Sequence, residues 1–157
     1  MTMRSITITG VIRAVPWVAL WLGQLGIGHA ALGGLPEPFN TAGMVVVSST
    51  SSTTTRYTLR DTTLNTGTHV REYIAAGGTV FAVVWEGPLL PDLKVLLGKH
   101  FDTLVTESLK APKAGRAPLA VNRPEVVIYS AGRMRAFEGS AWIPAQLPAG
   151  FSADEIR

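Results

Sequence analysis

The chain has 157 residues, of which 46% are hydrophobic, a formal net charge of +3 and no cysteine. The lack of cysteine excludes disulfides, thiolate nucleophiles and thiolate metal sites. Removing the first 30 residues, which hold Arg4 and Arg13 and no acid, would leave 127 residues and lower the charge by two, to +1. That length suits one domain with its own core, and the near-neutral charge gives no support to nucleic-acid binding.

The N-terminus is predicted to be a cleaved export signal. Its two arginines accompany a short apolar stretch over residues 14–27, and residues 28–30 (Gly-His-Ala) supply small residues where a signal peptidase cuts. Cleavage after Ala30 or after Ala31 fits equally well. A membrane anchor is the alternative, but the stretch is interrupted by proline and glycine and is shorter than the about 20 residues of a spanning helix. We therefore expect a periplasmic or secreted protein with no stable membrane anchor after cleavage.

Residues 31–55 are predicted to be an irregular lead-in to the domain. Residues 44–47 could pair as a short strand, and residues 48–55 are all Ser or Thr. Such a run could begin a strand or form a flexible linker, and its composition favours the linker. We therefore divide the chain into a signal (1–30), a lead-in (31–55) and a single α+β domain (56–157).

A β-hairpin is predicted over residues 56–75. The triplet Asn65-Thr66-Gly67 suits a three-residue hairpin loop that ends on a left-handed glycine. This loop places Arg60 opposite Glu72 and Asp61 opposite Arg71, so opposite charges meet on both faces of the ribbon. A two-residue loop would instead set Asp61 against Glu72, which disfavours that register.

A third strand and a helix are predicted to follow. A strand is predicted over residues 79–86, after a turn at Gly77-Gly78. Its residues 80–85 are apolar on both sides of the pleat, which is typical of an interior strand. From Asp92 to Leu104 the apolar residues recur at helical spacing. Gly98 lies inside that helix, where we expect it to allow a close approach to the sheet.

The last part of the chain predicts a loop, a hairpin and a coiled exit. Residues 110–124 are rich in proline and positive charge and are expected to form a mobile loop. Residues 125–130 and 133–138 are expected to pair around Ala131-Gly132, and Ser152 to Glu155 matches a capping box. The predicted fold is therefore α+β: a three-stranded antiparallel meander, one packed helix, and a further hairpin that extends the sheet.

Several ordered motifs resemble one bacterial exported family, domain-of-unknown-function family twenty-eight forty-four. The motifs are residues 71–73 (Arg-Glu-Tyr), 80–88, 91–93, 96–98, 100–101, 133–137 (Arg-Met-Arg-Ala-Phe) and 147–150. The resemblance covers the chain from about Ala31 to the C-terminus, and together the motifs are fairly specific. It implies export from a proteobacterial-type cell, and it brings neither an activity nor catalytic residues.

No catalytic, metal-binding or cofactor-binding residues are predicted. The part after the signal holds only His69 and His100, fewer than a zinc site requires unless carboxylates join them. No nucleophile elbow, phosphate loop or dinucleotide fingerprint is present. The alternative is an envelope hydrolase that uses carboxylates around Asp92 and Asp102 with His100.

The main hypothesis is a non-catalytic envelope accessory or binding protein with an unknown envelope protein or ligand as partner. The candidate binding surface consists of aromatic and arginine side chains, a mixture found at interaction sites: Arg71, Tyr73, Arg133, Arg135 and Trp142. The aromatic residues could equally belong to the core, and the two later arginines could protect an edge strand. A further alternative is a surface or assembly subunit that pairs through a sheet edge.

Overall fold

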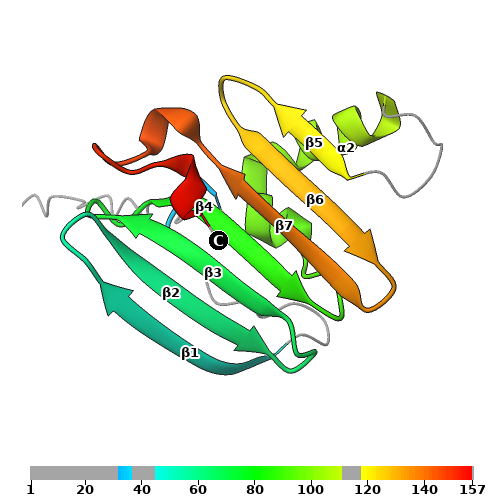
Figure 1. Cartoon of the computed structure of the whole chain (residues 1–157), viewed down its shortest axis with the longest axis horizontal. Helices are drawn as coiled ribbons and strands as arrows, with labels where there is room; N and C mark the ends of the chain where they lie inside the picture. The colour runs from blue at the N-terminus through cyan, green and yellow to red at the C-terminus, as the bar shows by residue number, and fades with distance from the viewer. Residues whose placement is uncertain (1–31, 37–44, 111–117, 157) are drawn as a thin grey trace, which may run out of the picture.

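The computed structural model describes residues 32–36, 45–110 and 118–156, which form one antiparallel sheet with helices on one face. The predicted export signal lies outside these residues. The strands are β1 (Val46–Thr53), β2 (Tyr57–Leu64), β3 (His69–Ala75), β4 (Val80–Gly87), β5 (Leu119–Asn122), β6 (Val127–Arg133) and β7 (Ala136–Trp142). Their spatial order is β1-β2-β3-β4-β7-β6-β5, so β4 is central (Figure 1). The α+β prediction is confirmed, but seven strands replace the predicted meander and hairpin.

The β2–β3 hairpin has the predicted register. Arg60 lies opposite Glu72 and Asp61 opposite Arg71. The loop closes through a hydrogen bond from the Gly67 N–H to the Leu64 carbonyl, and Gly67 has a φ of +79°. A left-handed residue at that position is what a three-residue hairpin loop requires. The prediction that β4 is an interior strand is also confirmed, because its first four residues are buried.

The prediction of a flexible linker in the Ser/Thr run is wrong, because residues 46–53 form the edge strand β1. This strand pairs with β2, and hydroxyl pairs join Ser49 to Thr62 at 3.3 Å and Thr53 to Thr58 at 3.1 Å. Threonine favours strands, and facing hydroxyl side chains stabilise a strand pair. Composition alone missed this because the partner hydroxyls lie in β2. The opposite edge strand, β5, likewise lies inside the predicted loop.

The prediction that the last hairpin turns at Ala131-Gly132 is also wrong. Arg133 pairs with Ala136, so the loop is Met134-Arg135 and Gly132 lies within β6. A Cβ on Gly132 would lie 2.6 Å from Cδ1 of Phe137 on the neighbouring strand. This glycine therefore makes room for an aromatic ring across the ladder and does not form the turn.

The helices cover one face of the sheet, here called the helix face. Instead of one continuous helix, α1 (Leu93–Leu97), η1 (Gly98–His100) and α2 (Phe101–Lys110) follow one another. The break lies at Gly98, whose φ of 52° and ψ of −128° are far from helical values, so the expected close-packing role is replaced by a conformational one. In the part of the chain that the structure describes, no helix is long and apolar enough to span a bilayer.

The opposite face, here called the front face, is turned toward the viewer in Figure 1 and is only partly covered. The C-terminal segment, with η2 (Pro144–Gln146) and η3 (Ala153–Glu155), lies over it. Phe151 and Ile156 of this segment pack on Tyr73, Phe81 and Ala82 of the sheet. The sheet therefore has two separate apolar clusters, a large one under the helices and a smaller one under the C-terminal segment.

Candidate functional site

The uncovered part of the front face contains two adjoining hollows of about 560 Å³ and 370 Å³. Both are lined by Glu86 of β4, Tyr129 of β6 and Glu138 of β7. The first hollow extends to the β6–β7 turn, and the second extends to Arg71 and to Ile156 of the C-terminal segment. Together they form one continuous surface, which we call the front groove.

The strand register places two carboxylates side by side at the centre of the front groove. Glu86 lies directly opposite Glu138, and His69 of β3 lies opposite Glu86 on its other side. Directly opposite residues in an antiparallel pair have Cβ atoms about 5 Å apart, a spacing at which like charges repel. Within the described ranges, neither glutamate carboxylate has a hydrogen bond or an ion pair, and His69 Nδ1 lies 3.2 Å from the Thr63 hydroxyl. The two carboxylates are therefore available to a cationic group.

Arginine side chains lie at both ends of the front groove. At one end, Arg71 is in ion-pair range of Asp61, at 3.6 Å, so its charge is already partly balanced. At the other end, Arg133 precedes the β6–β7 turn and Arg135 lies within it, and both are exposed. Both of these predicted binding residues therefore line the groove, and Arg71 does so as well.

The turn holds Arg135 in an unusual backbone conformation. Its φ is 63°, and among the described residues no other non-glycine residue has a positive φ. A two-residue loop with positive φ at its second position corresponds to a type II turn, where glycine or asparagine is usual. Holding an arginine in this conformation costs about 1 kcal/mol. The chain thus keeps a long cationic side chain at a position where a glycine would be cheaper.

The other two predicted binding residues are not part of this surface. Tyr73 is buried, and its ring lies 5.5 Å from Tyr57 and 5.9 Å from Phe151, measured between ring centroids. Trp142 is half-buried and packs against the same cluster. The expected surface role therefore does not fit Tyr73, because the C-terminal segment covers it. Sequence alone did not reveal that residues 144–156 fold back over these strands.

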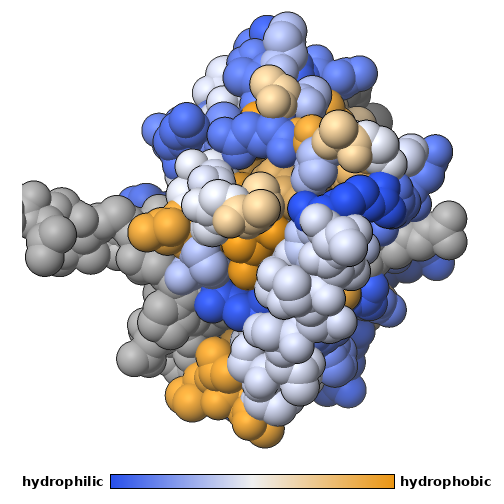
Figure 2. All heavy atoms as spheres, turned by 90° about the vertical axis from the view of Figure 1, so that its left-hand side faces the viewer, coloured by the Kyte–Doolittle hydropathy of each residue, from blue (hydrophilic) through white to orange (hydrophobic). Residues whose placement is uncertain are grey.

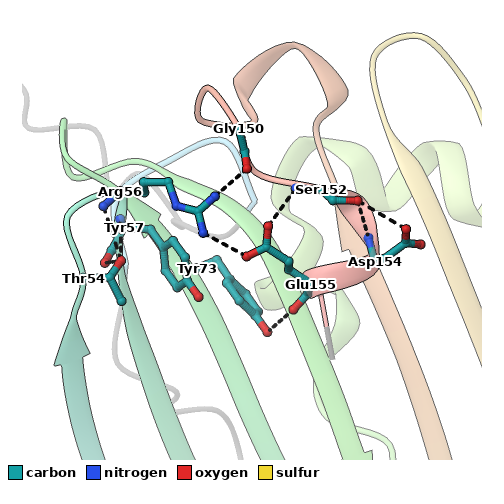
Figure 3. A network of polar contacts seen from close by, with 8 residues as sticks. All are labelled: Thr54, Arg56, Tyr57, Tyr73, Gly150, Ser152, Asp154 and Glu155. Atoms are coloured by element: carbon teal, nitrogen blue, oxygen red, sulfur yellow. Dashed lines mark hydrogen bonds and ion pairs between the residues drawn. The ribbon is translucent and has the colours of Figure 1, made fainter.

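Polar contacts fasten the C-terminal segment beside the groove (Figure 3). The Arg56 guanidinium donates to the Gly150 carbonyl at 2.5 Å and to the Glu155 carboxylate at 3.2 Å. The same carboxylate accepts the Ser152 N–H at 3.0 Å, completing the predicted capping box, and the Tyr73 hydroxyl donates to the Glu155 carbonyl at 3.3 Å. The segment that carries Ile156, and thus one wall of the second hollow, is anchored to Arg56, which directly precedes β2, and to Tyr73 of β3.

The residues of the hydrolase alternative lie away from the front groove. Asp92 caps α1, where its carboxylate accepts the N–H groups of Lys94 and Val95 at 2.9 and 3.2 Å. His100 is buried at the end of η1, and burial lowers its pKa, with the positive charge of Lys99 adding to that effect. Asp102 is exposed in the first turn of α2. In the part of the chain that the structure covers, no three His, Asp or Glu side chains gather closely enough to hold a metal.

Sequence reasoning missed Glu86 and Glu138 as groove residues. The missing signal was the β4–β7 pairing, which joins strands that are separated by both helices and two other strands. Had the last hairpin been placed with its turn at Met134-Arg135, alternation along β7 would have placed Glu138 on the same face as Arg133. The choice of Gly132 as a turn residue concealed this arrangement.

The comparison with protein families identifies the class of this protein. The sequence model of the family described as Protein of unknown function (DUF2844) matches residues 28–156, which agrees with the resemblance noted from the motifs. The chain belongs to this family. Comparisons with curated proteins and with solved structures found no match.

Proposed function

We propose that the chain is an exported, non-catalytic binding protein whose ligand occupies the front groove. The observation that supports this most directly is the pair of adjoining hollows that share Glu86, Tyr129 and Glu138. Binding sites are typically concave and combine aromatic surface with a few convergent polar groups. The groove has this composition, and its two central carboxylates have no partner within the described part of the chain.

The ligand is expected to present a cationic group to the centre of the groove. A cation placed between Glu86 and Glu138 would remove the repulsion between two facing carboxylates, and Tyr129, which is 39% exposed, offers an aromatic face beside them. Arg133 and Arg135 at the rim favour an acidic group at the ligand's other end. A peptide segment of mixed charge would satisfy both regions.

Binding is tested by NMR titration of the isotopically labelled protein with tetralysine and, separately, tetraglutamate at low salt. Tetralysine is expected to shift the backbone amides of Glu86 and Glu138, and tetraglutamate those around the β6–β7 turn. Glu86→Gln should weaken the tetralysine response, whereas Asp102→Asn, the same loss of charge on exposed α2, should leave it unchanged. If neither peptide shifts groove amides, or if both variants respond alike, the groove is not the binding site.

Export is supported by the composition of residues 1–30 and is tested separately. The full chain with a C-terminal tag is expressed in a Gram-negative cell, and the mass of the product is measured in each cell fraction. A product shortened by 30 or 31 residues in the periplasm or medium is expected. Intact, unprocessed protein in the cytosol would contradict export without affecting the binding proposal.

The non-catalytic part of the proposal is supported by the structural roles of the candidate catalytic side chains. The Asp92 carboxylate is used in helix capping, and His100 is buried against the segment that contains Gly33, whose Cβ position lies 3.9 Å from His100 Nε2. An activity panel on the purified protein is expected to give no turnover. Turnover that is abolished by His100→Gln, with folding retained, would restore the hydrolase alternative.

A further inference from the structure

The outer side of β1 is an exposed strand edge eight residues long. β1 is the last strand of the sheet, and all of its residues after Val46 are exposed. Figure 2 looks directly at this edge, where β1 crosses the view as a pale band of Ser and Thr side chains. Unpaired strand edges are templates for another strand, and proteins usually protect them with charges, proline or short length.

β1 has little of this protection. Residues 46–53 contain no charged residue and no proline, and the single β-bulge lies at the start, between Val46 and Ser48. The opposite edge differs in every respect, because β5 has four residues, lies between Pro118 and Pro124, and is followed by Arg123. Among the residues that the structure describes, pairing is therefore blocked at one edge of the sheet, and no strand pairs with the outer side of β1 at the other.

The pairing of β1 with β2 fixes which backbone groups point outward. The Thr54 N–H donates to the Tyr57 carbonyl at 2.8 Å, so residue 54 points its backbone toward β2. Backbone direction alternates along a strand, so Ser49, Ser51 and Thr53 direct their N–H and C=O groups away from β2. These three residues present six hydrogen-bonding groups in the spacing that an antiparallel partner strand needs.

A second copy of the same strand matches this edge. Antiparallel self-pairing would set Ser and Thr against Ser and Thr, repeating the hydroxyl contacts that β1 already makes with β2. No charged side chain within residues 46–53 opposes such a pair. Val45 and Val47, which are 57% and 67% exposed, would lie against the far end of the partner's strand and lose exposed apolar surface.

We propose that two copies of this chain associate through β1 in an antiparallel, two-fold symmetric pair that joins their sheets into one. The regular part of the strand is Ser48–Thr53, so the two-fold axis passes at Thr50 or Ser51. Each β1 edge is then used once, and the blocked β5 edges end the assembly at a dimer.

The dimer is tested by sedimentation of the full chain across a wide concentration range. The wild type is expected to shift from monomer to dimer. Ser51→Pro removes an outward N–H and leaves the β1–β2 hydrogen bonds in place. Because both copies lose a hydrogen bond, the dimer should weaken about tenfold or more. Ser51→Lys, which places like charges across the two-fold axis, should weaken it without a backbone change, and Ser108→Lys on α2 should not.

A cysteine assay locates the interface independently, because the natural chain has no cysteine. A residue on the two-fold axis faces its own copy at a Cα separation of about 4.5 to 5.5 Å, within the span of a disulfide. Either Thr50→Cys or Ser51→Cys is therefore expected to form a disulfide-linked dimer readily, whereas Ser108→Cys is not. A wild type that stays monomeric, a Ser51→Lys variant that associates like the wild type, or equal crosslinking of all three cysteines would overturn the proposal.

Discussion

The two faces of the sheet differ in how completely they are covered. On the helix face, Val83 and Trp85 of β4 and Leu97 of α1 have no exposed surface, and the apolar cluster continues into β5 and β6. On the front face, the C-terminal segment covers the aromatic cluster and leaves the groove open. A sheet with one fully packed face obtains most of its stability there, so side chains on the other face are free to serve recognition.

Two consecutive ion pairs of the β2–β3 hairpin show the same difference in burial between the two faces. Arg60–Glu72 lies on the helix face with side-chain exposures of 20% and 1%, whereas Asp61–Arg71 lies on the front face at 40% and 31%. Burial raises the pKa of Glu72, and the charge and hydrogen bond of Arg60 lower it by less. The same cross-strand chemistry thus has different consequences, because only the first pair has been removed from water.

The largest expected effect comes from breaking the buried pair. Glu72→Ala leaves the Arg60 guanidinium without its carboxylate in a mostly buried position, which should lower the free energy of unfolding by about 3–5 kcal/mol. Asp61→Ala on the front face should cost less than about 1 kcal/mol. Urea denaturation of both variants measures the comparison, and equal losses would show that burial does not separate the two pairs.

The next largest loss of stability is expected from a methyl group added at Gly139. Its Cβ would lie 2.5 Å from both Trp85 Cε2 and the Tyr129 carbonyl oxygen, inside the packed helix face. Gly139→Ala should therefore destabilise the protein by about 1–3 kcal/mol, because the indole must move. Gly77→Ala is the matched control, since nothing lies within 4 Å of its Cβ position. Thermal melts that do not distinguish these variants would contradict the packing described here.

The packing of the helix face should also make the stability of the protein depend on pH, through His100. Burial and the charge of Lys99 lower its pKa below 6.5, while Glu125 acts in the opposite direction. As the pH falls, the unfolded chain therefore takes up a proton at His100 before the folded protein does. The contribution of His100 to the free energy of unfolding has its full value above pH 6.5 and declines as the pH falls below 6.5. His100→Gln should flatten this decline between pH 7 and pH 5 in denaturant titrations. Parallel profiles for the wild type and the variant would contradict it.

Sequence reasoning succeeded where the determining contacts are local. The β2–β3 register follows from one loop and two charge pairs that lie within twelve residues of each other, and the capping box at Ser152 spans four residues. β4 was recognised as interior because its apolar residues fill both sides of the strand. In each case the partners are close in sequence, so composition and spacing contain the information needed.

It failed where the determining contacts are distant. The Ser/Thr run becomes β1 because it pairs along its length with β2, whose threonines also supply hydroxyl partners. Gly132 is a strand residue because Phe137 lies over it. The front groove depends on β4 meeting β7 and on the C-terminal segment returning to β2 and β3. Arginines at the rim could be predicted from composition, but the facing carboxylates at the centre required the strand order.

The smallest effect, and the one that best separates the two faces, concerns Glu86 and Glu138. Because these exposed carboxylates face each other, Glu86→Gln or Glu138→Gln alone should raise the free energy of unfolding by a few tenths of a kcal/mol. The double variant should gain little more, because the first substitution already removes the repulsion, and added salt should reduce the gain by screening. A double-mutant cycle at low salt measures this coupling. Removing a carboxylate from the front groove would then stabilise the protein, whereas removing the Glu72 carboxylate from the helix face destabilises it. A loss of stability in either single variant would show that the groove carboxylates have favourable partners in the folded chain.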